Sequence, residues 1–309
     1  MISLPDSVRV VEMLPRDGLQ RLDRFVPTDE KIEMVNDLAA TGVDEVEITS
    51  FTHPKAVPNL RDADEVAAGV DRYDGVTYRA LVPNGVGAER AVDAGVDKVN
   101  ALTTVSETYC RKNQGMTTEE NLDALRDVVD VAHGSGLEVE AGIATSFFCP
   151  YEGPIPQERT LSVLDAAVEA GVDEVTLATS MGMANPVQVD RMLDAVFERY
   201  PDLDVGLHLH DTNGMSLANT LVAMQAGVDR FDTSVCGLGG GVILAEGLSG
   251  VGNTPTEDLL LMCREMGLDF AAEFDAGADV AESSRERLDL PATSHVLMGG
   301  TPEAVLENA

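Results

Sequence analysis

The sequence predicts an α/β protein, a (β/α)8 TIM barrel with a helical C-terminal extension. The first observation is a repeat: Ala/Thr-Gly-Val-Asp, followed by a short apolar run, occurs four times, at residues 41–44, 94–97, 170–173 and 226–229. The second is that four further apolar runs lie between these repeats, with helical segments separating all eight runs. Strands that alternate with helices form parallel sheets. Eight units over about 250 residues fit a closed barrel, and a doubly wound sheet is the alternative.

The expected strands follow the chain in order. In each repeat the glycine is expected to end a helix in a left-handed conformation, and a strand begins directly after the aspartate. The eight strands are expected at Val8–Met13, Glu45–Thr49, Val76–Val82, Lys98–Leu102, Leu137–Ala144, Glu174–Ala178, Leu203–His210 and Arg230–Ser234.

Capping residues and prolines indicate where helices begin. Thr28 is expected to cap a helix over Asp29–Ala40, and Asn213 or Thr212 a helix over Met215–Ala226. Proline is favoured in the first turn of a helix because no backbone N–H needs a partner there. Three more helices are therefore expected, over Pro156–Ala170, Pro186–Tyr200 and Pro255–Met266.

The alternation of strands and helices stops near Gly267. Two further helical segments follow, Ala271–Leu288 and Pro302–Asn308. Since no linker or low-complexity stretch separates them from the barrel, we expect one domain over residues 1–309. The barrel would occupy about residues 1–267 and the helical extension about residues 268–309.

The chain is strongly acidic, and its acidic residues are dispersed. It has 21 Lys and Arg against 54 Asp and Glu, a formal net charge of −33. A dispersed acidic surface keeps a protein soluble and is typical of halophiles, so we interpret the charge as an adaptation to high salt. Such a surface also repels nucleic-acid backbones and anionic membranes, so we expect neither as a partner.

The cysteines and the apolar runs favour a cytoplasmic protein. The four cysteines lie far apart with no Cys-x-x-Cys pair, so they suggest neither a disulfide framework nor a thiolate metal site. No apolar run approaches the ~20 residues that span a bilayer. The first residues also lack the basic and apolar regions of a signal peptide.

Two histidines lie at the end of the run Leu203–Asp211. His208 and His210 are two residues apart, so on a strand their side chains share one face. Imidazoles are common ligands of divalent metals, and a pair on one face supplies half of a site. The alternative is that both are ordinary polar residues at the end of a strand.

Two oxygen ligands are expected at the same end of the barrel, because barrel enzymes place their reacting groups where the strands end. Asp17 follows the first strand, and Asn253 follows the last. With the two imidazoles, their oxygens form a mixed set that suits Mg²⁺ or Mn²⁺ better than zinc. Alternatively, Asp17 forms a surface ion pair with Arg16.

Polar residues also follow the second and eighth strands. Glu47 and Thr49 are two residues apart and are expected to share a face. Glu47 either belongs to the site or pairs with an arginine inside the barrel. The glycine-rich segment 237–241 lacks the Lys-Ser/Thr of a nucleotide-binding loop, so a lid over the site is the better interpretation.

Five motifs together resemble the 3-hydroxy-3-methylglutaryl-CoA lyase family, within the wider group of metal-dependent Claisen-condensing barrel enzymes (pyruvate carboxyltransferase type). The resemblance extends from about Val8 to Leu261, and the first and third motifs are the more specific for the lyase branch. The motifs are Pro15-Arg16-Asp17-Gly18-Leu19-Gln20, Val46-Glu47-Ile48-Thr49-Ser50-Phe51, Cys149-Pro150-Tyr151-Glu152-Gly153, His208-Leu209-His210-Asp211-Thr212 and Ala218-Asn219-Thr220-Leu221.

The resemblance implies a carbon–carbon lyase with an acyl-CoA substrate. The reaction would be a retro-Claisen cleavage of 3-hydroxy-3-methylglutaryl-CoA, or of a related 3-hydroxyacyl-CoA, to acetyl-CoA and a keto acid such as acetoacetate. A homodimer or a higher homo-oligomer is implied as well.

Roles for individual residues follow from the same resemblance. It implies that Mg²⁺ or Mn²⁺ is held by Asp17, His208, His210 and Asn253. Arg16 would stabilise the thioester oxygen, Glu47 would orient the substrate and its neighbours, and His208 would move protons. The substrate would be bound by Arg16, Gln20 and Ser50.

The sequence departs from the family pattern at two places. Gly241 stands where the family has its active-site cysteine, and Ala178-Thr179-Ser180 stands where it has Gly-Asp-Thr, so a carboxylate is lost near the site. Cys236 is a candidate to replace the missing thiol from another position. The default interpretation is that Cys236 is an ordinary small buried residue. A missing thiol is expected to affect protonation of the enolate, and metal binding need not be lost.

Two alternatives to the lyase remain open. The stretch around Asn253-Thr254-Pro255 is closer to condensing synthases, so a synthase or aldolase acting on a 2-oxo acid is the second reading. The third is a catalytically weakened barrel kept as a binding partner, which the lost cysteine suggests and the four retained metal ligands oppose.

Overall fold

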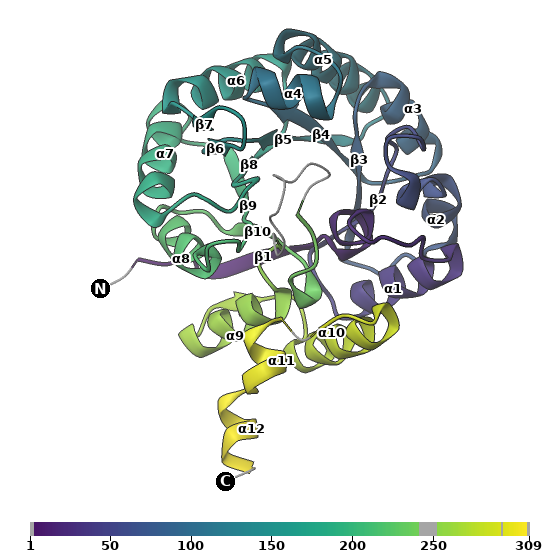
Figure 1. Ribbon diagram of the computed structural model, residues 1–309, viewed down its shortest axis with the longest axis vertical. Helices are drawn as coiled ribbons and strands as arrows, with labels where there is room; N and C mark the ends of the chain where they lie inside the picture. The colour runs from purple at the N-terminus through teal and green to yellow at the C-terminus, as the bar shows by residue number, and fades with distance from the viewer. Residues whose placement is uncertain (1–2, 241–251, 292, 308–309) are drawn as a thin grey trace.

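The computed structural model describes residues 3–240, 252–291 and 293–307. Within these residues, eight parallel strands form a closed ring surrounded by helices (Figure 1). Each barrel strand pairs with the next, and the last pairs with the first, with Arg9 opposite Arg230. The barrel strands are β1 (Ser7–Glu12), β2 (Glu45–Ser50), β3 (Thr77–Val82), β4 (Lys98–Thr104), β5 (Glu138–Ala144), β8 (Glu174–Ala178), β9 (Asp204–His208) and β10 (Arg230–Thr233).

This ring confirms the predicted (β/α)8 barrel. All eight expected strands are present, and their ends differ from expectation by at most two residues: β9 ends at His208, two residues early, and β4 ends at Thr104, two residues late. The helices are α1 (Thr28–Ala40), α2 (Ala63–Gly69), α3 (Gly85–Asp93), α4 (Glu107–Asn113), α5 (Thr118–Gly134), α6 (Gln157–Ala170), α7 (Pro186–Arg199), α8 (Ser216–Gln225), α9 (Thr256–Met266), α10 (Phe274–Leu288), α11 (His295–Gly299) and α12 (Pro302–Glu307). The remaining short elements are η1 (Leu14–Gly18), η2 (Pro58–Leu60), η3 (Val235–Gly237), β6 (Phe148–Cys149), β7 (Gly153–Pro154) and β11 (Asp269–Phe270).

The fourfold repeat links the end of a helix to a neighbouring strand. Its four glycines have φ angles of +70° to +100°, a region that glycine occupies without steric penalty. In three copies the aspartate side chain accepts a backbone N–H from another strand at 2.8–2.9 Å, and these pairs are Asp44 with Val10, Asp97 with Tyr78 and Asp173 with Val139. The repeat therefore fixes both the helix end and the adjacent strand.

Two expected helix caps are wrong. The Thr28 hydroxyl donates to a carboxylate at the start of α2 and does not cap α1. At the start of α8, Asp211 Oδ1 accepts the backbone N–H of Ser216 at 2.9 Å, in place of Asn213 or Thr212. In both cases a nearby carboxylate, a stronger acceptor than a hydroxyl, determines the hydrogen bond.

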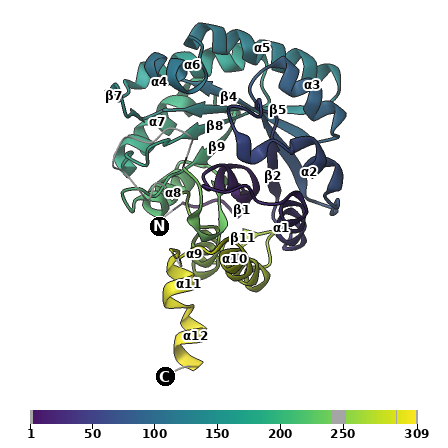
Figure 2. The same ribbon diagram turned by 45° about the vertical axis from the view of Figure 1, so that its right-hand side comes forward.

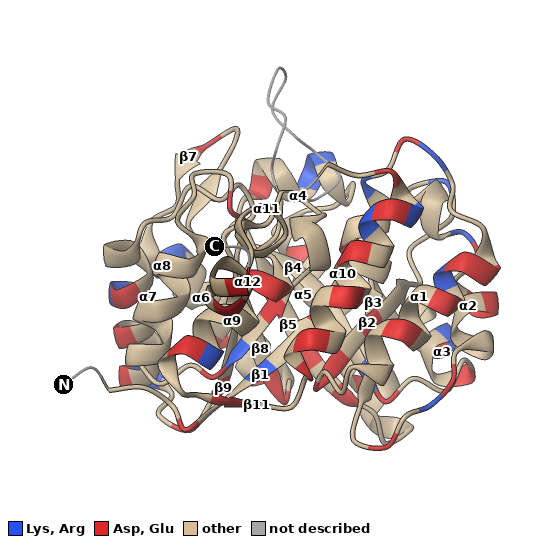
Figure 3. Ribbon diagram, turned by 90° about the horizontal axis from the view of Figure 1, so that it is seen from below, with Lys and Arg blue, Asp and Glu red and all other residues tan. Residues whose placement is uncertain are grey.

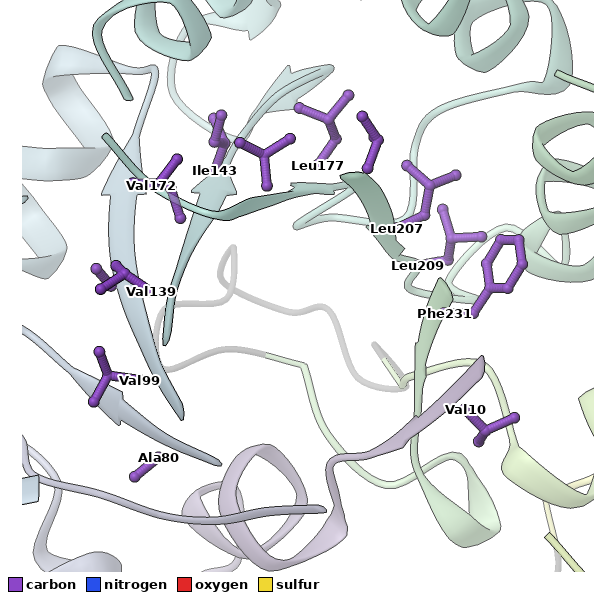
Figure 4. Close-up of a cluster of buried hydrophobic side chains, with 14 of the residues drawn as sticks. Val10, Ala80, Val99, Val139, Ile143, Val172, Leu177, Leu207, Leu209 and Phe231 are labelled. Atoms are coloured by element: carbon purple, nitrogen blue, oxygen red, sulfur yellow. The ribbon is translucent and has the colours of Figure 1, made fainter. Parts of the chain in front are cut away.

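The apolar core lies between the strands and the surrounding helices. Val10, Val99, Leu177 and Phe231 are at most 1% exposed and point outward from the ring of strands (Figure 4). Because strand side chains alternate between faces, the residues next to them point into the barrel.

The interior of the barrel is filled by paired charges. Arg79 and Arg230 are both fully buried. Arg79 Nη1 lies 2.8 Å from Glu140 Oε2, and its Nη2 lies 2.9 Å from Asp232 Oδ1. Arg230 also donates to Glu140. Among the described residues, this ionic layer fills the middle of the barrel.

The C-terminal segment packs beside the barrel. Helix α10 contacts α1 and α9, α11 contacts α9 and α10, and β11 pairs with β1. Helix α12 extends away from the barrel (Figures 1 and 2). The two helices expected here are present, and the short helix α11 was not expected. That the whole chain folds as a single domain remains a prediction.

Acidic residues are distributed over the helices around the barrel (Figure 3). Among the described residues, no helix is both long enough and apolar enough to cross a membrane.

Candidate active site

Three of the four expected metal ligands lie together at the C-terminal end of the barrel. Asp17 lies in η1, directly after β1, and His208 and His210 lie at and just beyond the end of β9. One ligand atom from each residue lies within 4.8 Å of those of the other two, and all three residues are buried. A carboxylate and two imidazoles at this spacing form a partial site for a divalent cation.

Asn253 lies beside this group and has an oxygen without a donor. It forms a β-bridge with His210, and its Nδ2 donates to Asp17 Oδ2 at 2.9 Å. Its Oδ1 is buried and has no hydrogen-bond partner among the described residues. A buried acceptor without a donor costs about 1–3 kcal/mol. An amide oxygen left in this state fits a metal ligand, so the residues present suit a divalent cation.

The two imidazoles are held by hydrogen bonds from Nδ1. His208 Nδ1 donates to Asp232 Oδ2 at 3.0 Å, and His210 Nδ1 donates to the Gly252 carbonyl at 3.3 Å. These bonds leave each Nε2 as the nitrogen available to a cation, the arrangement usual for metal-binding histidines. Burial and the neighbouring His208 lower the pKa of His210 to about 3, so His210 is neutral, as a ligand must be.

Asp17 is held as a carboxylate by several donors. Arg16 Nη1 and Gln20 Nε2 donate to its Oδ1 at 2.8 and 2.7 Å, and the Gly240 N–H donates to its Oδ2 at 3.0 Å. Burial alone would raise the pKa of Asp17, but Arg16 and the two imidazoles lower it below its usual range. Because Arg16 and Asp17 are only 7% and 2% exposed, they do not form a surface ion pair.

Glu47 lies beneath Arg16 and positions it. Glu47 Oε2 accepts a hydrogen bond from Arg16 Nε at 2.5 Å, and its Oε1 accepts one from Asn100 Nδ2 at 3.0 Å. The same carboxylate lies 3.6 Å from Arg79 Nε in the ionic layer. The two readings of Glu47 are therefore compatible, since it contacts a site residue and an interior arginine at once.

The expectation that Glu47 and Thr49 share a face is wrong. Glu47 pairs with Arg79, but Thr49 pairs with the next residue of β3, Ala80, because the register shifts between them. Consecutive residues on β3 point to opposite faces, so the alternation on β2 is interrupted.

A cavity of about 550 Å³ contains the site. Its size is within the range typical of small-molecule sites. Six of the eight expected site residues line it: Arg16, Asp17, Gln20, Ser50, His208 and His210. The two others are placed differently: Asn253 lies behind Asp17, and Glu47 lies beneath Arg16.

One buried carboxylate joins the segments that carry the ligands. Glu12 Oε1 accepts the backbone N–H groups of Leu14 and Val235, at 2.8 and 3.1 Å, and its Oε2 accepts the hydroxyl of Thr256 at 2.6 Å. Along the chain, Leu14 is close to Asp17, Val235 is close to the glycine-rich segment that begins at Gly237, and Thr256 is close to Asn253. Burial raises the pKa of Glu12 to about 7.

The sequence profile of the HMGL-like family matches residues 7–283 of this chain. This chain belongs to the HMGL-like family.

Relatives within the HMGL-like family cover nearly the whole chain. The hydroxymethylglutaryl-CoA lyase YngG of Bacillus subtilis (strain 168) is 40% identical over 293 residues, 95% of this chain and 97% of that protein. The crystal structure of a Bacillus subtilis HMG-CoA lyase has a TM-score of 0.92 at 40% identity and covers 96% of this chain and 98% of that one. The structure of an Acinetobacter baumannii HMG-CoA lyase in complex with coenzyme A and 3-methylmalate has a TM-score of 0.91 at 36% identity, covering 96% of both chains.

The departures from the family pattern have structural consequences where they can be described. Gly241 lies outside the described residues. Cys236 does not line the cavity; its Sγ donates to the Ala281 carbonyl at 3.2 Å, in an apolar cluster beside α10. It is thus the small buried residue that was the default interpretation. Ala178 and Ser180 line the cavity without supplying a carboxylate.

Sequence reasoning did not select many of the residues that line the cavity, among them Asn100, Tyr109 and Asp232. Asn100 and Asp232 had a usable signal, because each is a polar residue inside an expected apolar strand and lies on its inward face. Tyr109 had none, since it lies on a short helix after β4 whose position depends on the tertiary fold.

Proposed function

We propose that this protein is a carbon–carbon lyase that cleaves 3-hydroxy-3-methylglutaryl-CoA to acetyl-CoA and acetoacetate. Membership of the HMGL-like family and the extent of identity to curated hydroxymethylglutaryl-CoA lyases support this activity. The observation that supports it most directly is the group of Asp17, His208 and His210 inside a cavity of about 550 Å³.

A divalent cation, Mg²⁺ or Mn²⁺, fits this group, and we propose that Asp17, His208, His210 and Asn253 hold it. When bound, such a cation supplies Lewis acidity, which makes a nearby hydroxyl more acidic and stabilises negative charge on oxygen. The buried Oδ1 of Asn253 supports its inclusion, because this oxygen has no other partner among the described residues.

Arg16 is the proposed electrostatic group for the thioester. Its guanidinium lines the cavity and is fixed on two sides, by Glu47 at Nε and by Asp17 at Nη1. A cation held in place before the reaction stabilises an enolate oxygen without having to reorganise. Glu47 is then a positioning residue, since it contacts Arg16 and lies below the cavity.

Three further roles remain proposals. Ser50 and Gln20 line the cavity, and we assign them to substrate binding, although Gln20 Nε2 already donates to Asp17. The expected role of His208 in moving protons also remains a prediction, because its Nδ1–H is donated to Asp232.

Two lysines support binding of the phosphate end of coenzyme A. Among the described residues, neither Lys55 nor Lys112 forms an ion pair, in a chain with 54 acidic residues. Lys55 lies between Pro54 and Ala56, which line the cavity, and Lys112 precedes Asn113, which also lines it. Two ammonium groups without a carboxylate partner, on residues next to those that line one cavity, match the charge of a nucleotide phosphate.

The test of the proposed function is turnover of 3-hydroxy-3-methylglutaryl-CoA with Mg²⁺ or Mn²⁺ in molar KCl. We expect equal amounts of acetyl-CoA and acetoacetate. Absence of acetoacetate, with cleavage of another 3-hydroxyacyl-CoA, would refute the substrate and retain the reaction class. Absence of cleavage of any 3-hydroxyacyl-CoA would refute the lyase.

The environment and assembly of the protein are also proposals. We attribute the net charge of −33 to adaptation to high salt. Resistance to urea should then rise as KCl is raised from about 0.2 to about 2 M, because salt screens repulsion between surface carboxylates. The cytoplasmic location and the homo-oligomer remain predictions, and light scattering would test the latter.

A further inference from the structure

Cleavage that releases acetyl-CoA must deliver a proton to the carbon from which the keto acid departs. Building on the proposed function, we propose that the hydroxyl of Tyr109 donates this proton. Tyr109 lies on α4 and lines the same cavity as Asp17 and His208. Its side chain is almost fully buried, with 5% of the residue exposed, so its ring is fixed by packing.

The Tyr109 hydroxyl is free to donate. Among the described residues, the Tyr109 hydroxyl has no hydrogen-bond partner. Its oxygen is accessible, because it is absent from the fully buried atoms that have no partner. The hydroxyls of two other tyrosines are already engaged: that of Tyr78 accepts the Tyr73 N–H, and that of Tyr200 donates to Asp165. The hydroxyl of Tyr109 is therefore accessible, on a residue that lines the cavity.

The other hydroxyls that line the cavity each have a hydrogen-bond partner among the described residues, and these aliphatic hydroxyls are weaker acids than a phenol. Ser50 Oγ donates to Thr52 Oγ1 at 2.8 Å, and Ser180 Oγ accepts the Thr145 N–H at 2.7 Å. Thr176 Oγ1 accepts a hydrogen bond from Arg230 at 3.0 Å. The Nδ1–H groups of the two imidazoles are also committed.

The acidity of Tyr109 suits this role. Burial and the negative charge of Asp17 raise its pKa to about 12, so the hydroxyl carries its proton at neutral pH. A phenol of this acidity is still a far stronger acid than the methyl group of acetyl-CoA, so proton transfer to the enolate is downhill.

A motif without an assigned role in the chemistry holds Tyr109 in position. Glu152, from Cys149–Gly153, accepts hydrogen bonds from Ser106 Oγ at 2.7 Å and from the Thr108 N–H at 2.9 Å. Ser106 Oγ in turn accepts the Tyr109 N–H at 3.1 Å and caps α4. The loop that carries this motif thus fixes the first turn of α4 and, with it, the direction of Tyr109.

The proposed step is balanced. The tertiary hydroxyl of the substrate loses its proton to water through the proposed proton carrier His208, and its oxygen becomes the carbonyl of acetoacetate. The electron pair of the broken carbon–carbon bond becomes the enolate of acetyl-CoA. The O–H bond of Tyr109 then breaks, its proton forms the new C–H bond of the acetyl group, and its electron pair stays on the phenolate oxygen. The phenolate recovers a proton from water before the next turnover.

The reverse of this step provides the test. Wild-type protein with Mn²⁺ should exchange the methyl protons of acetyl-CoA with D₂O, measured by mass spectrometry. Tyr109→Phe should lower both exchange and turnover by about 100-fold or more, the usual size of a general-acid contribution. Its KM, Mn²⁺ affinity and urea midpoint should not change, because the deleted oxygen has no partner.

Tyr73→Phe is the matched control. Tyr73 is exposed and does not line the cavity, so exchange should match wild type. Exchange by Tyr109→Phe within about threefold of wild type would overturn the assignment of Tyr109. If the wild-type protein exchanges protons but does not cleave 3-hydroxy-3-methylglutaryl-CoA, the proposed substrate is wrong, and exchange by Tyr109→Phe still tests the assignment of Tyr109. If the wild-type protein neither exchanges protons nor cleaves this substrate, both proposals are wrong.

Discussion

The ionic layer inside the barrel and the residues at the strand ends are both buried and polar, but they differ in how their charges are balanced. In the ionic layer, Arg79 and Arg230 each contact several carboxylates. At the strand ends, the three proposed metal-ligating side chains converge and Asn253 Oδ1 lacks a donor among the described residues. Arg79 Nε and Glu140 Oε1 in the ionic layer also lack a hydrogen-bond partner there, but each belongs to a group with an opposite charge within 4 Å. The first region therefore holds its counter-charges within the fold, whereas we propose that the second binds a cation.

The largest effect on stability is expected in the ionic layer. Arg79→Met leaves Glu140 and Asp232 buried without their shared cation, and removing one partner of a buried pair costs about 3–5 kcal/mol. The free energy of unfolding, from urea titration in molar KCl without divalent metal, should fall by this amount. His210→Ala, measured in parallel, should lose less than half as much. Equal losses would remove the distinction between the two regions.

A smaller effect concerns a carboxylate that has no cation beside it. The pKa of Glu12 is about 7, against a usual 4.5, so the folded state binds a proton more tightly than the unfolded state. The resulting stabilisation is complete below about pH 4.5 and is lost as the pH rises through 7. The difference of about 2.5 units corresponds to about 3 kcal/mol.

Glu12→Gln tests this pH dependence, because the amide imitates the protonated acid. Its oxygen can accept both N–H groups, and its NH₂ can donate to Thr256 Oγ1. The fall in unfolding free energy between pH 5 and pH 8 should shrink by about 2.5 kcal/mol and not vanish, since Glu257 also has a pKa of about 7. An unchanged pH profile would show that Glu12 has an ordinary pKa.

The next effect is on metal affinity alone. A Cβ on Gly239 would clash with Asn253 Nδ2 and lie 2.5 Å from Asp17 Oδ2. Gly239→Ala should therefore weaken Mn²⁺ binding by about 10–100-fold, as disturbance of groups around a metal site does. Gly136→Ala is the control, because Gly136 also has a positive φ but nothing lies within 4 Å of its Cβ position. Similar affinities in both variants would contradict the close packing of Gly239 on the ligands.

The smallest effect is expected at the rim of the cavity. Lys55→Ala and Lys112→Ala should each raise KM for the coenzyme A thioester by about 3–10-fold at the lowest KCl that keeps the protein folded, since salt screens exposed charges. The same acyl group on pantetheine, which lacks the nucleotide, should show no change. Arg191→Ala removes an equal charge on α7 and should leave both KM values unaltered. A rise for both thioesters would contradict the phosphate assignment.

The sequence predicted what depends on local chain geometry. Strand alternation placed His208 and His210 together, and the glycine repeats marked the helix ends. The rule that barrel enzymes place their reacting groups at the strand ends added Asp17 and Asn253. The sequence could not predict that Asp232 meets Arg79, 153 positions away, because such pairs depend on which strands become neighbours around the barrel.

Departures from regular geometry also escaped the sequence. The register shift after Glu47 reverses the facing of β2, and no residue type at that position marks a bulge. The role of Glu12 was missed for another reason: its partners are mainly backbone N–H groups, which every residue except proline carries.

Mn²⁺ titration of the purified protein, followed by electron paramagnetic resonance, tests the central claim most directly. Wild type should bind one ion per chain, His210→Ala should bind none at the same concentrations, and His133→Ala, which alters an exposed histidine paired with Asp173, should bind like wild type. Undiminished binding by His210→Ala would contradict the assignment of the strand-end residues as the metal site.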